Sequence, residues 1–254
     1  MTPTALVTGA RRGIGRAIAL SLADAGFNVA VNDIAPSDEL EGVIRTITAK
    51  GRKAASVIAD LSDLSHHARL LDEAEAALGP LTTLVNNAGV SVMNRGDLLD
   101  VSVESYDRCL DVNTRGTFFL TQAFAKRLLA RERKGPHHSI ITITSSNAVA
   151  VSINRGEYCI SKAGLSMASQ LFAARLSNDG IGVYEIQPGF IATEMVAPSK
   201  ARYDKLIEEG LTTIKRFGEP EEVGKVVTTL ATGSLPYTSG QIIRVDAGLL
   251  TVRY

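Results

Sequence analysis

The sequence predicts an α/β protein whose parallel sheet is covered by helices on both faces, and three observations lead to that prediction. Short apolar runs alternate with helical patterns along all 254 residues. Ala, Val, Ile, Leu and Gly dominate, whereas aromatic residues make up only 5% and Trp is absent, which is typical of parallel strands between helices. No repeat or linker divides the sequence, so we expect one domain over residues 1–254, built from right-handed strand–helix–strand units.

Short runs of apolar residues predict the strands, and apolar residues spaced three and four apart predict the helices. In the first helix, Ile14, Ile18 and Leu22 recur at this spacing. Ser62 is expected to cap the third helix, and Pro220 to stand in the first turn of the last. The expected strands lie at residues 5–7, 27–31, 54–59, 83–85, 139–144, 183–186 and 241–245. The expected helices lie at residues 13–25, 37–50, 62–78, 103–131 and 157–177, and from 221 onward.

Two segments interrupt this alternation. Residues 131–138 carry many charges, and we expect a solvated surface loop there. Residues 195–217 form a long excursion after a strand, and extra segments of this kind often cover a substrate.

Charge and composition exclude several classes of function. The 27 basic residues balance 27 acidic ones, so no global field favours nucleic acid or an anionic membrane. No signal-type segment opens the sequence, and no apolar stretch approaches the ~20 residues of a membrane helix. Cys109 and Cys159 form neither a disulfide framework nor a metal-ligand pattern. We expect a soluble cytoplasmic protein without a metal site, a nucleic-acid partner or a membrane contact, and with solvated histidines at positions 66, 67, 137 and 138.

A glycine-rich turn joins the first strand to the first helix at residues 8–15 (TGARRGIG). The glycines at positions 9, 13 and 15 would let the backbone approach a pyrophosphate, whose charge the amides at a helix N-terminus stabilise. The spacing differs from the G-x-G-x-x-G form, and a simple tight turn is the alternative interpretation.

An acidic residue closes the second expected strand. Asp33 is placed to hydrogen-bond the hydroxyls of an adenosine ribose, and its charge would repel a 2′-phosphate. Arg12 favours the opposite choice, because its guanidinium would pair with that phosphate. We give Asp33 the greater weight, so NAD is the expected cofactor and NADP the alternative.

Tyr158 and Lys162 stand four residues apart, and Ser145 lies thirteen residues before the tyrosine. Positions i and i+4 share one face of a helix, so the ammonium would stand beside the phenol. A free phenol titrates near ~10, and a neighbouring cation favours the phenolate. The pair is therefore a candidate proton-transfer device.

The chain resembles the classical short-chain dehydrogenases/reductases in seven motifs that follow one another in the family's order. The resemblance spans residues 6–248 and implies a single Rossmann domain with a doubly wound, seven-stranded parallel sheet. It also implies a homotetramer and reversible hydride transfer between a nicotinamide and a carbonyl or alcohol. The motifs are residues 8–15, residues 86–89 (NNAG), Asn113, Ser145, Tyr158, Lys162 and the pair Pro188 and Gly189.

The resemblance assigns a catalytic role to four side chains. Tyr158 would be the acid/base, and Lys162 would lower the pKa of the phenol and hold the nicotinamide ribose. Ser145 would hydrogen-bond the substrate oxygen. Asn113 would anchor a water in a proton relay through Lys162.

The resemblance also implies the cofactor contacts. Asp60 would meet the adenine amino group, residues 87–89 would line the adenosine ribose side of the cleft, and Ile191 and Thr193 would face the carboxamide. The full expected set is Gly9, Arg11, Arg12, Gly13, Ile14, Gly15, Asp33, Asp60, Leu61, Asn87, Ala88, Gly89, Tyr158, Lys162, Pro188, Gly189, Ile191 and Thr193. One departure from the family is Ala247, where a second glycine is usual. We expect it to affect the geometry of the local backbone and not the chemistry.

Polar residues around the tetrad favour a small polar alcohol or ketone, such as a sugar, a polyol or a hydroxy acid. The expected substrate contacts are Ser145, Asn147, Asn154, Arg155 and Met195. A 3-oxoacyl-[acyl-carrier-protein] reductase is the first alternative, and Asp33 disfavours the NADPH that such enzymes usually take. A non-catalytic dinucleotide-sensing protein is the second, and the complete tetrad disfavours it.

Overall fold

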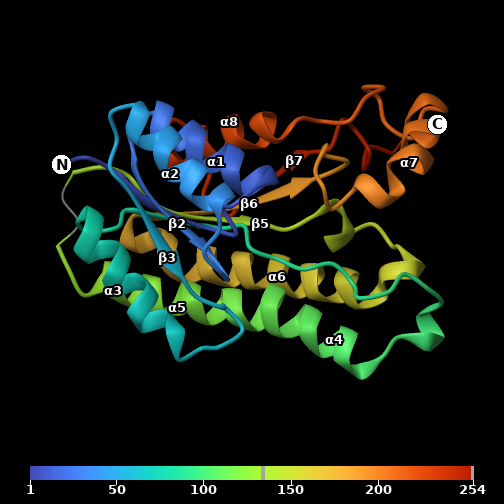
Figure 1. Ribbon diagram of the computed structural model, residues 1–254, viewed down its shortest axis with the longest axis horizontal. Helices are drawn as coiled ribbons and strands as arrows, with labels where there is room; N and C mark the ends of the chain where they lie inside the picture. The colour runs from blue at the N-terminus through green and yellow to red at the C-terminus, as the bar shows by residue number, and fades with distance from the viewer. Residues whose placement is uncertain (133–134, 253–254) are drawn as a thin grey trace.

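Seven strands pair side by side in one parallel sheet of order β3-β2-β1-β4-β5-β6-β7 (Figure 1). The computed structural model of the protein describes residues 1–132 and 135–252. This strand order is characteristic of the doubly wound Rossmann fold, so the predicted fold class is confirmed. The strands are β1 (Thr4–Thr8), β2 (Asn28–Asp33), β3 (Ala54–Ile58), β4 (Thr83–Asn86), β5 (His138–Ile143), β6 (Ile181–Pro188) and β7 (Ile242–Val245).

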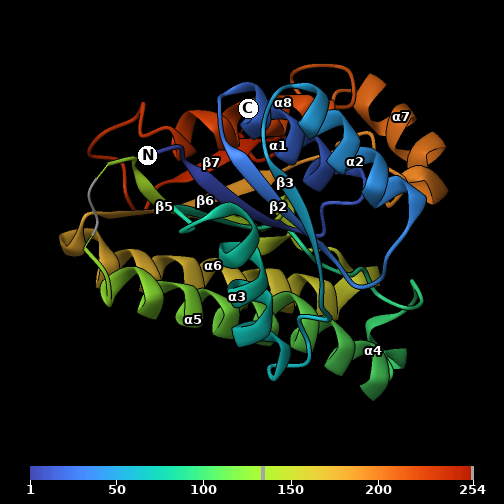
Figure 2. The same ribbon diagram turned by 60° about the vertical axis from the view of Figure 1, so that its left-hand side comes forward.

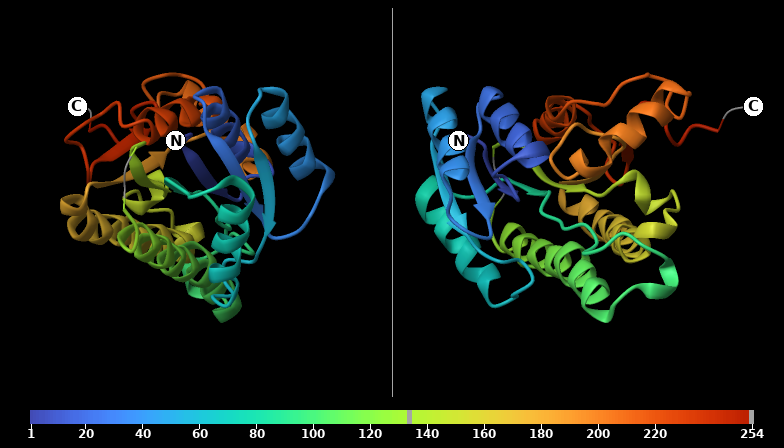
Figure 3. Two further views of the ribbon diagram at one scale, coloured as in Figure 1. Left: turned by 90° about the vertical axis from the view of Figure 1, so that its left-hand side faces the viewer. Right: turned by 45° about the vertical axis from the view of Figure 1, so that its right-hand side comes forward.

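Helices cover both faces of the sheet, as Figures 1 and 2 show. One face carries α1 (Gly13–Asp24), α2 (Asp38–Ala49) and α8 (Pro220–Ala231). The opposite face carries α3 (His66–Leu78), α5 (Thr117–Leu129) and α6 (Gly156–Leu176), with α4 (Val103–Cys109) ahead of α5. The remaining helix, α7 (Lys200–Glu208), lies at one end of the molecule (Figure 3).

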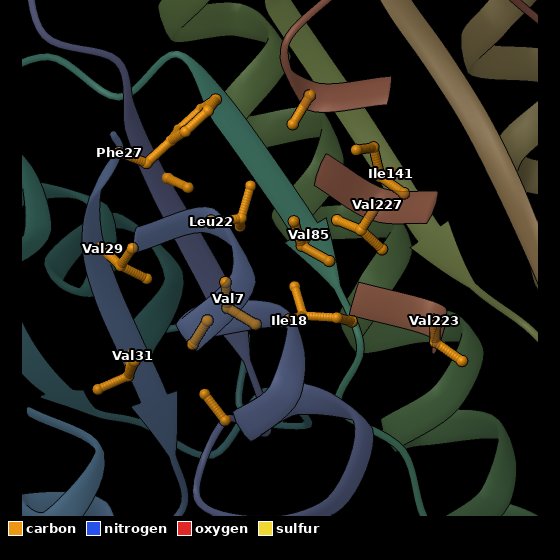
Figure 4. Close-up of a cluster of buried hydrophobic side chains, with 14 of the residues drawn as sticks. Val7, Ile18, Leu22, Phe27, Val29, Val31, Val85, Ile141, Val223 and Val227 are labelled. Carbon is orange, nitrogen blue, oxygen red and sulfur yellow. The ribbon is translucent and has the colours of Figure 1, made fainter. Parts of the chain in front are cut away.

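Each face of the sheet packs on its own hydrophobic core because successive side chains of a strand point to opposite faces. In β1, Val7 joins the core under α1 and α8, whereas Leu6 joins the core under α3 and α5. Figure 4 shows the first core, where Ile18 and Leu22 of α1 lie among strand valines and side chains of α8. Burial of each such side chain contributes about 1.5–3 kcal/mol, and this packing holds the strand ends in fixed positions.

The strand order reverses at β1, which pairs with β2 on one side and β4 on the other. Doubly wound sheets bind ligands at the carboxyl ends of the strands beside such a point. Thr8 ends β1 and Asn86 ends β4 at this edge, so the glycine-rich turn and the 86–89 motif begin next to each other.

The helix expected at residues 103–131 is interrupted. α4 ends at Cys109, a π-helical segment spans Leu110–Gly116, and α5 follows without a break in the backbone. α3 also begins later than expected, at His66 behind Ser65. Ser62 is not its cap, because the Ser62 hydroxyl donates to Asp60 Oδ1 at 2.8 Å.

The expectation of solvated histidines is wrong. His67 is 3% exposed with its Nε2 2.9 Å from the Leu61 carbonyl oxygen, and burial lowers its pKa. His138 is buried in β5, and the other two histidines are half-buried. The charged loop is only partly solvated, because half-buried Arg131 forms an ion pair of 2.6 Å with Glu75. Positions 133 and 134 of that loop lie outside the described residues.

The segment at residues 195–217 contains structure of its own. Its helix α7 packs through Tyr203 on Phe190, with ring centroids 4.5 Å apart. Its far end is fastened to Ala247, whose carbonyl oxygen accepts from the backbone and hydroxyl of Thr213 at 2.8 and 2.7 Å. Ala247 has a φ of +53°, which L-residues other than Asn and Asp rarely adopt. The unusual alanine therefore does bear on local geometry.

Among the described residues, every helix is too short or too polar to cross a bilayer.

Candidate active site

Tyr158 and Lys162 lie in the first two turns of α6, and both side chains are buried. The Lys162 ammonium stands 5.8 Å from the centre of the Tyr158 ring and donates to the Ile143 carbonyl oxygen at 3.2 Å. The Tyr158 hydroxyl shares a hydrogen bond with Ser145, which follows β5. The structure therefore brings together three of the four residues that the sequence nominates for catalysis.

Electrostatics at this centre differ from the expectation in one respect. Burial raises the pKa of the Tyr158 phenol above its usual value, while the Ser145 hydrogen bond and then the Arg155 charge lower it. Burial also lowers the pKa of Lys162 to about 8. Desolvation penalises the charged forms of both groups, so Lys162 would have to offset the burial of the phenol in order to lower its pKa.

Asn113, the fourth nominated residue, lies in the π-helical segment and is fully buried. Its Oδ1 accepts from the Val90 amide at 2.7 Å, and its Nδ2 donates to the Val90 carbonyl oxygen at 3.0 Å. Segments of π-helix recur at functional sites because the widened turn redirects a side chain. Here the side-chain amide of Asn113 holds Val90, in the loop after β4, against the π-helical segment.

Sequence reasoning missed Ser161, which joins the two halves of this centre. Its hydroxyl donates to the Tyr158 carbonyl oxygen at 2.8 Å and accepts from Asn113 Nδ2 at 2.9 Å. The residue is completely buried, so these bonds are shielded from water. Its place three positions after Tyr158 was the available signal, because positions i and i+3 are neighbours on a helix.

Two glycines of the glycine-rich turn, Gly9 and Gly15, stand where a side chain has no room. A Cβ on Gly15 would overlap the Gly9 carbonyl oxygen and lie 2.5 Å from Asn87 Nδ2. Gly9 itself has a φ of +62°, and a Cβ there would lie 2.8 Å from the Ala88 Cα. Positions of this kind require glycine for both conformation and space.

A second missed residue, Thr8, holds this turn against the 86–89 motif. Its hydroxyl oxygen accepts from the amides of Asn87 and Ala88, both at 3.0 Å. In return, Asn87 Nδ2 donates to the carbonyl oxygens of Thr8 and Gly9 at 2.9 and 3.0 Å. Asn87 therefore holds the turn in place. Gly89 of the same motif lies beside Lys162, because a Cβ added to Gly89 would be 3.3 Å from Lys162 Nζ.

The N-terminus of α1 opens onto the glycine turn. Arg12 occupies the N-cap position, where Ser, Thr, Asp or Asn would normally accept from the first amides. An arginine has only donors, so the first amides receive no cap from this residue. A turn held open by glycines beneath uncapped helix amides fits the pyrophosphate of a dinucleotide.

Asp33 ends β2 beside this turn and is mostly buried, with 13% of its side chain exposed. It accepts from the Arg11 amide at 3.4 Å, and the Arg11 Nε lies 3.9 Å away. Arg12, the residue weighed as a partner for a 2′-phosphate, instead forms an ion pair with Glu194. The arginine next to Asp33 is therefore Arg11. Asp60, at the following strand end, accepts from the Ser62 amide at 2.9 Å.

The 188–193 run faces the glycine turn from the end of β6. A Cβ on Gly13 would lie 3.4 Å from the Thr193 methyl group, so the two loops face each other. Pro188 ends β6, and Gly189 fits closely because its Cβ would lie 2.7 Å from Asp246 Cα. The Ile191 side chain is 3% exposed and belongs to the hydrophobic core. A carboxamide contact of Ile191 would therefore involve its main chain.

The expected substrate residues differ in their surroundings. Asn147 is buried, its Nδ2 donates to the Ala150 carbonyl oxygen at 3.0 Å, and its Oδ1 accepts from Arg155. Arg155 is half-buried, with its Cζ 5.1 Å from the centre of the Tyr158 ring. Asn154 lies in the same short turn and accepts from the Ser152 hydroxyl at 2.9 Å, whereas Met195 is exposed.

The residues present fit a nicotinamide dinucleotide. The glycine turn and the α1 amides suit its phosphates, and the carboxylates at the ends of β2 and β3 suit its adenosine part. Residues 86–89 and 188–193 then flank a path toward Tyr158 and Lys162. The fit rests on the absence of space for side chains at Gly9 and Gly15 and on the strand order.

Comparison with known proteins assigns the family. The family model described as "Enoyl-(Acyl carrier protein) reductase" matches residues 9–250. The chain belongs to the short-chain dehydrogenase/reductase family, and it is an NAD(P)-dependent oxidoreductase acting on CH–OH or keto groups.

Three relatives illustrate the likeness. A 3-oxoacyl-[acyl-carrier-protein] reductase of Staphylococcus aureus is 36% identical over 251 residues, which are 98% of each chain. A 3-oxoacyl-[acyl-carrier protein] reductase of Brucella melitensis in complex with NAD is 42% identical, with a TM-score of 0.97 over 100% of this chain and 99% of the other. A putative 2-deoxy-D-gluconate 3-dehydrogenase of Agrobacterium tumefaciens with bound NADP is 31% identical, with a TM-score of 0.86 over 98% and 97%.

Proposed function

We propose that the protein transfers a hydride reversibly between a nicotinamide cofactor and a secondary alcohol or ketone on a small polar substrate, with Tyr158 as the acid/base. The observation that carries this proposal is the buried Tyr158 hydroxyl, hydrogen-bonded to Ser145 beside Lys162. When bound, the cofactor supplies or accepts the hydride. A sugar, a polyol or a hydroxy acid is the expected substrate.

The four polar residues divide the proton chemistry among them. In the reducing direction, Tyr158 gives its proton to the carbonyl oxygen, and in the oxidising direction it removes the proton of the alcohol. Ser145 donates to the same oxygen as negative charge develops on it. Lys162 holds the nicotinamide ribose and passes protons toward a water held near Asn113. Proton transfer of this kind requires groups already aligned, and the bonds of Ser161 to Asn113 and to the Tyr158 carbonyl support that alignment.

NAD is the proposed cofactor because Asp33 lies where the adenosine ribose would bind and is mostly shielded from water. A carboxylate there pairs with ribose hydroxyls and repels a 2′-phosphate. Arg11, at 3.9 Å, partly neutralises Asp33, so the discrimination is expected to be moderate. Asp33→Ala should raise kcat/KM with NADP relative to NAD, and an unchanged ratio would refute this role.

The polar lining around Tyr158 supports a small polar substrate. Buried Asn147 and half-buried Arg155 stand between β5 and α6. An apolar acyl chain there would leave donors of the Arg155 guanidinium unpaired. We also propose that residues 195–217 cover the substrate, because α7 meets the loop after β4 through Arg95 and Tyr203, at 3.4 Å.

The second candidate is a 3-oxoacyl-[acyl-carrier-protein] reductase, which the names of the Staphylococcus and Brucella relatives favour. The Brucella relative is in complex with NAD, so the cofactor alone does not separate the two candidates. The substrate does, since one candidate takes a small polar molecule and the other an acyl thioester on a protein.

A spectrophotometric screen at 340 nm decides between these candidates. NAD and NADP are tested in parallel against polyols, sugars, hydroxy acids and acetoacetyl thioesters. The proposal predicts turnover of polar alcohols with NAD. Oxidation of NADH or NADPH by acetoacetyl thioesters, without turnover of the polar alcohols, would instead establish the second candidate.

We propose a homotetramer whose contact faces lie on α5 and α6. These helices present large apolar side chains to the surface, among them Phe119, Ile160, Met167 and Leu171, and exposed apolar surface of this kind marks association sites. Light scattering coupled to size exclusion should give four times the chain mass of 27.0 kDa.

A further inference from the structure

We infer that Arg155 binds a carboxylate, so the substrate is a short oxo or hydroxy acid whose acid group pairs with this guanidinium while its reacting oxygen meets Tyr158 and Ser145. The inference rests on the proposed function and narrows its substrate class.

Position and contacts place Arg155 beside the reacting centre. It ends the short turn Ile153–Arg155 immediately before α6, three residues ahead of Tyr158. Its Cζ lies 5.1 Å from the centre of the Tyr158 ring. Nη2 is held by Asn147 Oδ1, which fixes the orientation of the guanidinium. Asn147 is itself anchored through Nδ2 to the Ala150 carbonyl oxygen, so it is a positioning residue for Arg155.

The guanidinium has donors to spare. Its Nε is buried and lacks a hydrogen-bond partner within the described part of the chain. An arginine carries five N–H donors in a planar fork that matches the two oxygens of a carboxylate. A buried donor without a partner is unfavourable. Nη1, which is not among the buried atoms and has no acceptor among the residues that the structure describes, is the donor that a substrate carboxylate would meet first.

The charge of Arg155 is also unbalanced. Across residues 1–132 and 135–252, none of the ion pairs of the structure involves this arginine. The acidic residue closest in sequence, Glu157, turns its carboxylate to Ser105, which donates to Oε1 at 2.6 Å. A half-buried cation with no protein anion favours an anionic partner from outside.

The short distance to the Tyr158 ring sets the size of that partner. The acid group must lie within a few bonds of the carbon that receives the hydride, as it does in 2- and 3-hydroxy acids and in sugar acids. An acyl thioester is neutral near its reacting carbon and would leave the guanidinium unpaired. Arg155 therefore favours acids over neutral alcohols through binding, without entering the proton transfer itself.

Matched substrate pairs test this inference. The wild type is assayed with NAD on lactate and 3-hydroxybutyrate, each beside its methyl ester, and on gluconate beside sorbitol. For at least one pair, kcat/KM should favour the acid by about tenfold or more, as expected for a charge-assisted bond. Arg155→Gln should reduce this ratio by about tenfold, chiefly through KM of the acid, and Arg155→Lys should reduce it less because the charge remains.

Arg175→Gln is the control, because it removes the same charge from an exposed arginine at the far end of α6. It should leave the acid-to-neutral ratio unchanged. NADH fluorescence titration and thermal unfolding check that each variant binds cofactor and is folded.

The possible failures are distinguishable. Equal turnover of acids and their neutral counterparts, or an equal loss for both in Arg155→Gln, overturns the inference and leaves the proposed function intact. Turnover of neutral alcohols without turnover of acids would likewise overturn the inference and leave the proposed function intact. If every acid, ester and polyol fails while acetoacetyl thioesters react, both the inference and the proposed substrate class are wrong.

Discussion

The two sides of the candidate active site are built differently. On the nucleotide side, the backbone fixes the shape, because a Cβ on Gly9 or Gly15 would meet other main-chain atoms and Asn87 clamps the turn from above. On the side where we propose that the substrate binds, side chains on short turns and loops form the lining, among them half-buried Arg155 and exposed Met195.

Because of this difference, one side of the site determines the class of reaction and the other side determines the substrate. A surface made of backbone tolerates little change, so it keeps the binding of one cofactor type and the placement of Tyr158 beside it. A surface made of side chains on loops accepts substitution with little cost to the fold. We therefore propose that a few side chains such as Arg155 decide the substrate, and that Tyr158 lies where the two sides meet.

The largest effect is expected at Tyr158, where the two sides of the site meet. Tyr158→Phe keeps the ring and removes only the transferable proton, so kcat should fall by a factor of about 10²–10⁴. Cofactor affinity, measured by NADH fluorescence, should stay nearly unchanged. Residual activity above a few per cent would exclude Tyr158 as the acid/base.

The nucleotide side should be intolerant of one added methyl group. In Gly15→Ala, the new Cβ overlaps the Gly9 carbonyl oxygen, so the free energy of unfolding should fall by about 1–3 kcal/mol and cofactor affinity should drop sharply. Chemical denaturation and NADH titration measure both. Gly42→Ala is the matched control, because its Cβ would meet only the Arg45 side chain at 3.7 Å within α2. It should stabilise the protein by about 0.5–1 kcal/mol, and similar behaviour of the two variants would contradict the account.

Lys162 should destabilise the fold in a pH-dependent way. Its pKa of about 8 lies below the usual 10.5 because it is buried, so folding disfavours the proton it carries. The penalty is full below pH 8 and disappears as pH rises toward the unfolded value, so wild-type stability recovers in that window. Relative to Lys162→Met, the wild type should gain on the order of 1–3 kcal/mol between pH 7 and pH 10. Urea unfolding of both proteins across this range measures the gain, and a constant difference would contradict it.

The smallest effect is expected where residues 195–217 are fastened to Ala247. Ala247→Gly relieves a φ of +53°, a strain of about 1–2 kcal/mol, which the greater freedom of glycine in the unfolded chain partly offsets. Calorimetry should show a rise in Tm of a degree or two, following about 0.5 kcal/mol. Ala76→Gly on the exposed face of α3 is the control and should lower stability by about 1 kcal/mol. A fall of equal size in both variants would rule out strain at Ala247.

Local patterns were enough to predict the strands, most helices and the pairing of Tyr158 with Lys162. A helix fixes which residues share a face, so the spacing of Tyr158 and Lys162 implied that they meet. The place of Ser145 beside them was implied by the family resemblance, because a serine at a strand end is otherwise a common turn residue. The glycine turn could also be predicted, because glycines at a junction of strand and helix indicate a backbone that has no space for side chains.

Contacts distant in sequence decided the rest. The π-helical segment at Leu110–Gly116 contains ordinary helix residues, and its widened turn is stabilised by bonds of Asn113 to Val90 and Ser161, 23 and 48 positions away. Arg12 turned to Glu194, 182 positions away. His67 lies at helical spacing from Leu70, Leu71 and Ala74, but its polar side chain favoured solvent as the expectation. Such pairings depend on how the elements pack, which no single segment encodes.

Hydride transfer itself can be followed with NADH that carries deuterium at both C4 positions of the nicotinamide, using the ketone that the 340 nm screen identifies. The account predicts one deuterium on the carbinol carbon of the product and loss of this labelled product in Tyr158→Phe despite retained NADH binding. A product free of deuterium, or labelled alcohol formed at the wild-type rate without the phenol, would contradict it.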